Sequence, residues 1–197
     1  MPSEKVLISG VFERIGIDGS FYTIKINGEK IKKEVPLKSH EDAVKILTEE
    51  LINYNIVKDL SEIKGVDQRV IHVGDKYADS TIINKHVTDT IRELFHLAPL
   101  HNPANLMGIE AFQEYIPEAP NVAVFDTGYP QSMPEESYTY AIPYEWTKKY
   151  GARKYGFHGI SHEYLTETMK KELGKEDINL ITCHLGNGSS IFAIKDG

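Results

Sequence analysis

The sequence predicts an α/β fold that opens with a group of strands and continues with helices and strands in alternation. In the N-terminal third, apolar and polar residues alternate with a period of two, which is typical of strands. From residue 40 onward, apolar residues recur at helical spacing between short apolar runs. The 197 residues are 41% hydrophobic and 26% charged, so the chain is long and apolar enough to bury an ordinary globular core.

The N-terminal third is predicted to be an antiparallel meander. Residues 5–12 form a short apolar run, and residues 21–26 and 30–35 alternate between apolar and polar. Asn27-Gly28 lies between the two alternating segments, and this dipeptide favours a tight hairpin turn. The three segments therefore read as consecutive, paired strands.

The remaining elements follow from a change of period and from capping residues. Asn102-Pro103 is a plausible N-cap and first-turn pair, Ser161 a plausible N-cap, and Gly174 a natural residue after a helix end. We predict helices over 40–53, 84–97, 102–115 and 161–173, and strands over 70–73, 122–125, 180–183 and 190–194.

Charge and cysteine content exclude several classes of protein. The net charge of −7 gives no general attraction to nucleic acid or to anionic membranes. No apolar stretch approaches the length of a membrane span. Cys183 is the single cysteine, and a lone thiol fits a reducing compartment. We expect a cytoplasmic protein.

The first segment that could carry chemistry is Val122-Ala123-Val124-Phe125-Asp126-Thr127-Gly128. An apolar strand here delivers a carboxylate at its C-terminal end, where ligands gather in open α/β sheets. Asp126 could orient a ligand, accept a proton or hold a metal through water. The alternative is a structural aspartate in the turn after a strand.

The second segment is His184-Leu185-Gly186-Asn187-Gly188-Ser189-Ser190. Two glycines around an asparagine let backbone amides approach a phosphate, and hydroxyl groups follow at once. The alternative is a plain hairpin turn.

Arg69 and three histidines complete the set. Arg69 lies inside an apolar strand pattern and needs a partner, either an anionic ligand or a structural ion pair, because a buried unpaired charge is costly. His158 precedes a predicted helix and could donate a hydrogen bond to a phosphate oxygen. His158 and His162 are four residues apart, but Gly159 between them and the absence of nearby acidic or cysteine ligands argue against zinc. His101 lies between two prolines in a loop.

Taken together and in order, these segments resemble the acetate kinase family over nearly the whole chain. Four runs carry the resemblance: Leu97-Ala98-Pro99-Leu100-His101-Asn102-Pro103; Val124-Phe125-Asp126-Thr127 with Gln131-Ser132-Met133-Pro134; Lys154-Tyr155-Gly156-Phe157-His158-Gly159 with Ser161-His162; and His184 to Ser190.

The resemblance implies an actin-like (ribonuclease H-like) α/β domain with a mixed sheet flanked by helices. The family belongs to the acetate and sugar kinase, Hsc70 and actin superfamily, whose members have two such domains with ATP bound between them. By resemblance, the chain is an N-terminal portion that lacks the family's first strand. Residues 1–178 would form the N-terminal domain, and residues 179–197 the first hairpin of a C-terminal nucleotide-binding domain.

The resemblance also implies roles for individual residues. Four residues would be catalytic: Asp126, Arg69, His158 and His101. Asp126 would also bind Mg²⁺ (or Mn²⁺) indirectly, through water. Arg69 would bind the substrate carboxylate or phosphoryl group. Ile71, Leu100 and Phe157 would line the pocket for the methyl group. His184, Leu185, Gly186, Asn187 and Gly188 would bind nucleotide phosphates. Family members are expected to be homodimers.

The expected reaction is ATP + acetate giving ADP + acetyl phosphate, reversibly, with this chain as an incomplete part that is inactive alone. One alternative is a propionate or other short-chain acyl kinase, and another is a non-catalytic phosphate-binding or interaction module. Where the family has a valine, Ile71 adds one methylene to the pocket wall. Other departures are Val73 in place of glycine, Gly128-Tyr129-Pro130, and Ile160 in place of threonine.

Overall fold

A computed structural model gives the structure of residues 5–197, which fall into two compact units. One unit combines Met1–Val66 with Leu106–Asn121, and the other combines Asp67–Asn105 with Val122–Gly197. The first four residues of the predicted domain 1–178 lie outside the described part. The predicted boundary between residues 178 and 179 stays a prediction.

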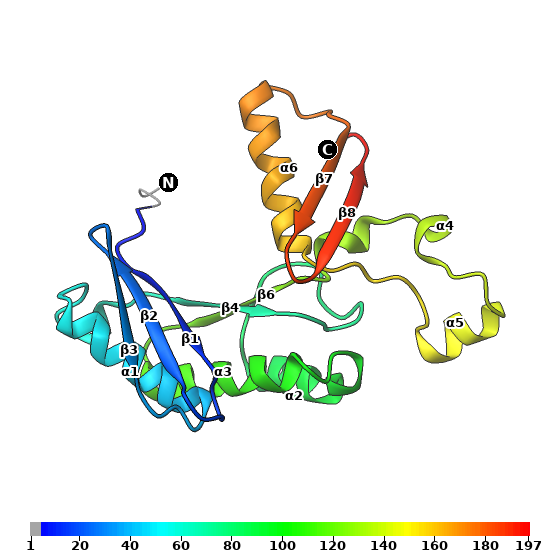
Figure 1. Cartoon of the computed structure of the whole chain (residues 1–197). Coiled ribbons are helices and arrows are strands. Elements are labelled where there is room, and N and C mark those ends of the chain that lie inside the picture. Colours follow the sequence, from blue (N-terminus) through cyan, green and yellow to red (C-terminus); the bar gives the residue numbers. More distant parts are fainter. Residues whose placement is uncertain (1–4) are drawn as a thin grey trace. The chain divides into compact units, whose positions relative to one another are not determined.

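The first unit begins with the predicted meander. Strands β1 (Ser9–Glu13), β2 (Phe21–Ile26) and β3 (Glu29–Glu34) pair antiparallel in the order β1-β2-β3 (Figure 1). Asn27 and Gly28 both have positive φ angles, 49° and 83°, as a tight hairpin turn requires. The hairpin prediction is confirmed.

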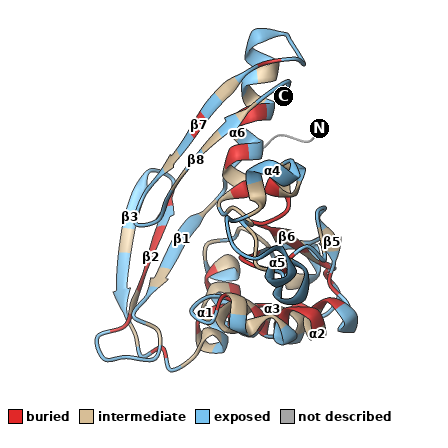
Figure 2. Ribbon diagram, turned by 90° about the vertical axis from the view of Figure 1, so that its right-hand side faces the viewer, coloured by how far each residue is buried: buried red, intermediate tan, exposed pale blue. Residues whose placement is uncertain are grey.

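Helix α1 (His40–Asn53) has the predicted bounds. It is fixed at its start by a capping box in which Ser39 and Asp42 exchange side-chain to backbone hydrogen bonds. Tyr22, Ile24 and Ile26 of β2 form the buried core of the meander, with Ile46 and Tyr54 packed against it. Figure 2 shows the contrast between buried positions on β2 and the exposed strand β3. A short 3₁₀ helix, η1 (Leu60–Glu62), follows.

The second unit is built on a sheet in the order β4-β6-β5, formed by β4 (Val66–Val70), β5 (Thr81–Ile82) and β6 (Asn121–Phe125). The predicted helix 84–97 is shorter: α2 (Lys85–Glu93) is capped by Asn84, and η2 (Phe95–Leu97) follows a break at Leu94. Helix α3 (Asn102–Tyr115) starts in this unit, and its later turns belong to the first unit.

The predicted strand 70–73 is wrong, because β4 ends at Val70. Beyond it the backbone bonds to side chains of α3 rather than to a neighbouring strand. The amide of Ile71 donates to Asn105 Oδ1 (3.2 Å), and Asn102 brackets the backbone of His72 with bonds of 3.2 and 2.7 Å. These two asparagines hold the segment that follows Arg69 in place.

The rest of the second unit contains both predicted and unpredicted elements. The unpredicted ones are η3 (Tyr129–Ser132), α4 (Glu135–Tyr138) and α5 (Tyr144–Tyr150). Helix α6 (Gly159–Leu173) ends at Leu173 with Gly174 as its C-cap, as predicted. Strands β7 (Leu180–Leu185) and β8 (Ser189–Ile194) form the predicted hairpin around residues 186–188.

Ser161 does not cap α6, contrary to the prediction. The helix starts two residues earlier, at Gly159, with His158 in the capping position. Across residues 5–197, none of the helices combines the length and the apolar character that a membrane crossing requires.

Candidate functional site

A pocket of about 640 Å³ in the second unit brings together most of the predicted site residues. Its wall comes from the end of β4, the loop after η2, the end of β6, the start of α6 and the start of β8. The lining residues are Arg69, Ile71, Leu97, Ala98, Pro99, Leu100, His101, Asp126, Phe157, His158, Gly188, Ser189 and Ser190.

An ion pair between Arg69 and Asp126 lies in this wall. Arg69 Nη2 is 2.6 Å from Asp126 Oδ2 and Nε is 3.2 Å from Oδ1, so the guanidinium binds the carboxylate with two parallel bonds. The Asp126 side chain is 2% exposed, whereas that of Arg69 is 55% exposed. Arg69 lies in strand β4 as predicted, but its side chain is not buried and reaches from solvent over a buried carboxylate.

Asp126 also fixes the start of α6 through its backbone. The amide of Gly159 donates to the carbonyl oxygen of Asp126 (3.0 Å). A Cβ at position 159 would collide with this oxygen and come within 2.7 Å of Pro130 Cδ. Only glycine allows the helix to approach β6 so closely, and this approach places His158 beside the ion pair.

His158 has a left-handed backbone, with φ 59° and ψ 25°. This conformation is uncommon for a non-glycine residue and often marks a functional position. Its ring stacks on His184 with centroids 4.1 Å apart, and its Nδ1 is 2.9 Å from Ser190 Oγ. A Cβ on Gly188 would lie 3.3 Å from His158 Nε2, so the imidazole edge borders the glycine-rich turn.

The surroundings of His158 favour its neutral form. Burial lowers the pKa of this imidazole below its ordinary value, and the neighbouring His184 and Arg69 lower the pKa further, while Asp126 opposes them. A neutral imidazole can present either a donor or an acceptor nitrogen to a ligand.

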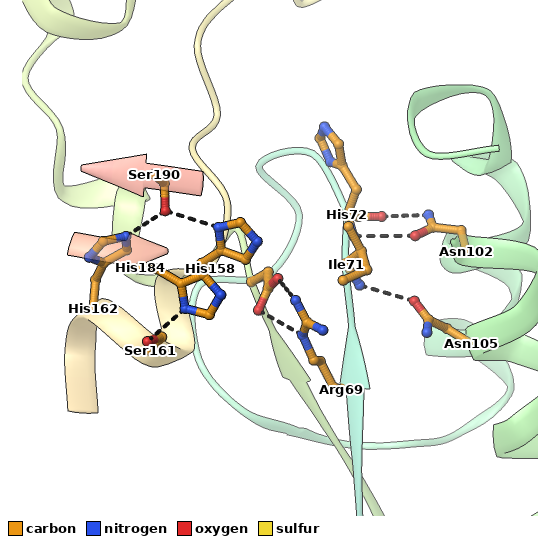
Figure 3. A network of polar contacts seen from close by, with 11 residues as sticks. Arg69, Ile71, His72, Asn102, Asn105, His158, Ser161, His162, His184 and Ser190 are labelled. Carbon is orange, nitrogen blue, oxygen red and sulfur yellow. Dashed lines mark hydrogen bonds and ion pairs between the residues drawn. The ribbon is translucent and has the colours of Figure 1, made fainter. Parts of the chain in front are cut away.

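His184 lies on a second pocket of about 420 Å³, which is also lined by Arg69, Asp126 and His158. His184 Nδ1 is 3.1 Å from the hydroxyl of Ser161, which gives that serine a contact inside the first turn of α6 (Figure 3). The ion pair and His158 therefore contribute to the walls of both pockets.

The predicted apolar wall is present in the larger pocket. Ile71 is buried, Phe157 is 40% exposed and Leu100 is 86% exposed. The ring of His72 packs edge-on against Phe157, with centroids 5.4 Å apart. His101 lines the same pocket from an exposed loop position.

Only part of the glycine-rich turn reaches the pockets. Gly188 lines the larger one, whereas Leu185, Gly186 and Asn187 line neither. The amide of Gly186 donates to the carbonyl of Gly188 (3.0 Å), as in a hairpin loop. Phosphate binding by residues 184–188 stays a prediction.

Sequence reasoning missed several contacts that hold the site together. Asn102, Asn105 and Ser190 bond to site residues that lie far away in the sequence. For His162 the sequence indicated no role beyond a zinc site, which Gly159 argues against, and a place in one of the runs that resemble the family. The nearest signals in the sequence were the asparagines one helical turn apart and a serine directly after a glycine-rich turn.

The site does not form a metal cage by itself. Among residues 5–197, no group of three or more histidine, cysteine or acidic side chains could hold a metal ion. Asp126, the one carboxylate on the two pocket walls, has both oxygens bonded to Arg69.

His72 supports Phe157 and gives the fold a specific pH dependence. The ring is buried, and burial lowers its pKa to about 4, with a smaller contribution from His96. Because this pKa lies below the unfolded value of 6.5, the unfolded state takes up the proton first as the pH falls. Above pH 6.5 the ring is neutral in both states, and the free energy of unfolding is not reduced by His72. As the pH falls from 6.5 to about 4, protonation of the unfolded state lowers that free energy.

We expect His72→Asn to remove about 3 kcal/mol of this pH-dependent loss of stability. An asparagine retains an acceptor for the amide of Gly74, which now bonds to His72 Nδ1 at 3.0 Å. Urea unfolding of both proteins from pH 7 to pH 4 measures the difference. Parallel stability curves for the two proteins would contradict this role of His72.

Comparison with known proteins places the chain in a family. All of residues 1–197 match the Acetokinase family. The acetate kinase of Bacillus velezensis is 52% identical over 199 residues, which cover the whole chain and 50% of that relative. The chain thus spans about half the length of the curated relatives it matches.

Solved structures agree with the fold. The acetate kinase of Porphyromonas gingivalis superposes with a TM-score of 0.93 at 42% identity, over the whole chain and 51% of that protein. A propionate kinase from Francisella tularensis gives 0.90 at 40% identity, over 98% of the chain and 49% of that protein. The predicted mixed α/β, actin-like fold is confirmed, and the chain belongs to the acetokinase family.

Proposed function

We propose that this chain forms the carboxylate-binding wall of an acetate kinase. In the reaction, a carboxylate oxygen of acetate attacks the γ-phosphorus of ATP, the bond to the bridging oxygen breaks, and acetyl phosphate and ADP form. The observation that supports this best is the pocket in which Arg69 and His158 lie beside an apolar wall of Ile71 and Phe157. That combination suits a small anion with a short apolar tail.

Arg69 is the group proposed to bind the anion. Its bonds to Asp126 use Nε and Nη2, which leaves Nη1 for a ligand at the exposed end of the side chain. Acetate is already ionised at neutral pH, so its attack needs no general base. Asp126 therefore acts in this proposal by orienting the guanidinium, not by accepting a proton.

His158 is proposed to contact the transferring phosphoryl group. Phosphoryl transfer proceeds through a loose transition state and is helped mainly by positioning and by charge stabilisation. A neutral imidazole next to Gly188 and Arg69 provides a hydrogen bond without adding a charge that must be desolvated. His101 lies on the same pocket and is proposed to support the site.

ATP or ADP, Mg²⁺ (or Mn²⁺) and a homodimeric assembly are further parts of the proposal. Mg²⁺ keeps several waters and often binds through substrate phosphates and few carboxylates. Since the residues described here make no metal cage, we assign no step to the metal. The single cysteine, Cys183, supports a cytoplasmic setting.

The test is a chimaera in which this chain replaces the matching 199 residues of the Bacillus velezensis acetate kinase. Acetyl phosphate formation from ATP and acetate is measured for the chimaera, for the isolated chain and for the parent enzyme. We expect turnover by the chimaera and none by the isolated chain. A non-catalytic role would leave a folded chimaera without turnover.

Propionate is the second candidate substrate, because one solved relative is a propionate kinase at 40% identity. We expect Ile71→Val to raise the ratio of kcat/KM for propionate over acetate by about 10-fold. This is the low end of the roughly 10–200-fold, or about 1–3 kcal/mol, that one methylene in a pocket is worth. The substitution removes a methylene from the pocket wall and so enlarges the space for the apolar end of the substrate.

Ile91→Val is the matched control for the selectivity change. It removes the same methylene from a fully buried position on α2 that does not line the pocket. Both variants are expected to lose about 0.5–1.5 kcal/mol of stability. An equal change in the substrate ratio in both variants would show that Ile71 does not set selectivity.

A further inference from the structure

His158 is one end of a chain of four polar side chains within the second unit. Its Nδ1 lies 2.9 Å from Ser190 Oγ, and the same oxygen lies 2.7 Å from His162 Nε2. On its other side, His162 Nδ1 is 2.7 Å from Thr182 Oγ1. Figure 3 shows the two histidine rings on either side of Ser190.

The inner part of this chain is shielded from water. His162 is fully buried and Thr182 is 6% exposed. The ring of His162 stacks on Phe192, with centroids 3.9 Å apart and planes 9° apart. Hydrogen-bond partners for these atoms must therefore come from the protein, so the three bonds constrain one another.

The direction of the hydrogen bonds follows from counting protons. Each hydroxyl has one proton and two lone pairs, and each neutral imidazole has one N–H, so three arrangements make all three bonds. The bonds can run along the chain in either direction, or both rings can donate to Ser190. If His158 donated from Nδ1, the proton of either Thr182 or Ser190 would be left without an acceptor. Within residues 5–197 the histidine rings are the hydrogen-bond partners of these two hydroxyls. A buried donor without an acceptor is unfavourable.

In the opposite direction, each hydroxyl proton of the chain has an acceptor. Thr182 then donates to His162 Nδ1, His162 Nε2 donates to Ser190, and Ser190 donates to His158 Nδ1. We propose that Thr182, His162 and Ser190 form a directed hydrogen-bond chain that holds His158 with its proton on Nε2, the nitrogen nearest to Gly188. His162 and Ser190 are thus positioning residues for His158.

Neutral imidazoles are required for this chain, and the surroundings favour them. Burial lowers the pKa of His162 below its ordinary value, with smaller contributions from His158 and His184 that outweigh the opposing effect of Asp126. The pKa of His158 is lowered in the same way. The consequence for an anionic ligand rests on the proposed function: His158 would meet a phosphate oxygen with an N–H group and not with a lone pair.

The test is the tautomeric state of His158 and His162, measured in the protein as given by its sequence. Long-range ¹H–¹⁵N spectra of the histidine-labelled protein at pH 7 report which ring nitrogen carries the proton. His158→Gln and His162→Gln identify the signals of each ring. We expect Nε2 to be protonated and Nδ1 bare in both rings. A proton on Nδ1 of either ring, or mixed tautomers of His158, would overturn the proposal.

Variants test whether the bonds act as a chain. Ser190→Ala removes the link between the rings, and we expect His158 to lose its fixed tautomer and His162 Nε2–H to exchange with solvent. Thr182→Val should release the tautomer of His162, whereas Thr182→Ser should keep it. If Ser190→Ala fails to fold, the Thr182 pair decides, and unchanged spectra in Thr182→Val would overturn the chain.

Thr166→Val is the matched control. Thr166 is also buried on α6, but its hydroxyl donates to the backbone carbonyl of His162 (2.8 Å) and not to the ring. We expect both rings to keep their tautomers in this variant. Loss of the fixed tautomers here would show that general packing, rather than the chain, sets them.

Inorganic phosphate separates this inference from the proposed function. Added to the labelled protein, phosphate should move the Nε2–H signal of His158 more than that of His162. If the tautomers are as expected but phosphate moves neither signal, the hydrogen-bond chain stands and the contact of His158 with an anion is overturned. If phosphate moves the signal of a Nδ1-protonated His158, the chain is overturned and anion binding stands.

Discussion

Arg69→Ala in the chimaera is expected to lower kcat/KM for acetate by about 10²–10³-fold, the usual loss when one preorganised group that stabilises charge is removed. Arg69 carries the positive charge that lines both pockets, and its guanidinium is fixed by two bonds to Asp126. Arg69→Lys keeps the charge but loses the fork geometry, so its activity should lie between those of the other two proteins. Acetyl phosphate formation at varied acetate concentration measures the effect.

The same substitution should destabilise the fold modestly. Asp126 would remain buried without its partner, which we expect to cost about 1–3 kcal/mol. Arg92→Ala is the control, because it breaks an ion pair with Asp89 whose side chains are 50% and 40% exposed. That change should stay within about 0.5 kcal/mol. Equal activity of Arg69→Ala and the unsubstituted chimaera would contradict the role of Arg69.

Gly159→Ala is expected to destabilise the chain by about 2–4 kcal/mol, the sum of a steric clash and a lost hydrogen bond. The new Cβ would collide with the backbone oxygen of Asp126 and with Pro130 Cδ, and both are held in the interior. The start of α6 must then move away from β6, which also displaces His158. Urea unfolding of the isolated chain measures the change.

Gly108→Ala is the control for the loss of a glycine. Gly108 lies within α3, and a Cβ there would have no atom within 4 Å. We expect this variant to be neutral or to gain about 0.5–1 kcal/mol, because alanine favours a helix. A Gly159→Ala protein as stable as Gly108→Ala would contradict the close contact between α6 and β6.

Local signals predicted the elements that local interactions define. The bounds of α1 were predicted because one helical face is apolar, and the β2–β3 hairpin because Asn27-Gly28 favours its turn. Helix α5 (Tyr144–Tyr150) was missed because it has no buried residue and therefore no apolar stripe. Strand β5 has only two residues, too few for a periodic pattern.

The errors near the site arise from contacts that are distant in the sequence. A strand was predicted as far as Val73 because the run is apolar. In the structure, the backbone amides of Ile71 and His72 donate to asparagine side chains of α3 instead. Ser161 was predicted as a cap because serine is a good one. The helix instead starts at Gly159, whose amide finds an acceptor in Asp126, 33 residues earlier.

The candidate site was predictable as a set of residue types but not as an arrangement. Arg69, Asp126 and His158 stood out as polar residues beside apolar runs. The bond between Arg69 and Asp126 joins residues 57 positions apart, and the link from His158 to Ser190 joins residues 32 apart. No local pattern indicates such pairs, so the sequence does not predict that Arg69 binds Asp126.

We propose above that this chain forms the carboxylate-binding wall of an acetate kinase. The most direct test is acetyl phosphate formation from ATP and acetate by the chimaera, measured beside its Arg69→Ala variant. The claim predicts steady turnover by the chimaera and a large loss in the variant. A chimaera that unfolds cooperatively and binds ATP, yet forms no acetyl phosphate where the Bacillus velezensis parent does, would contradict it.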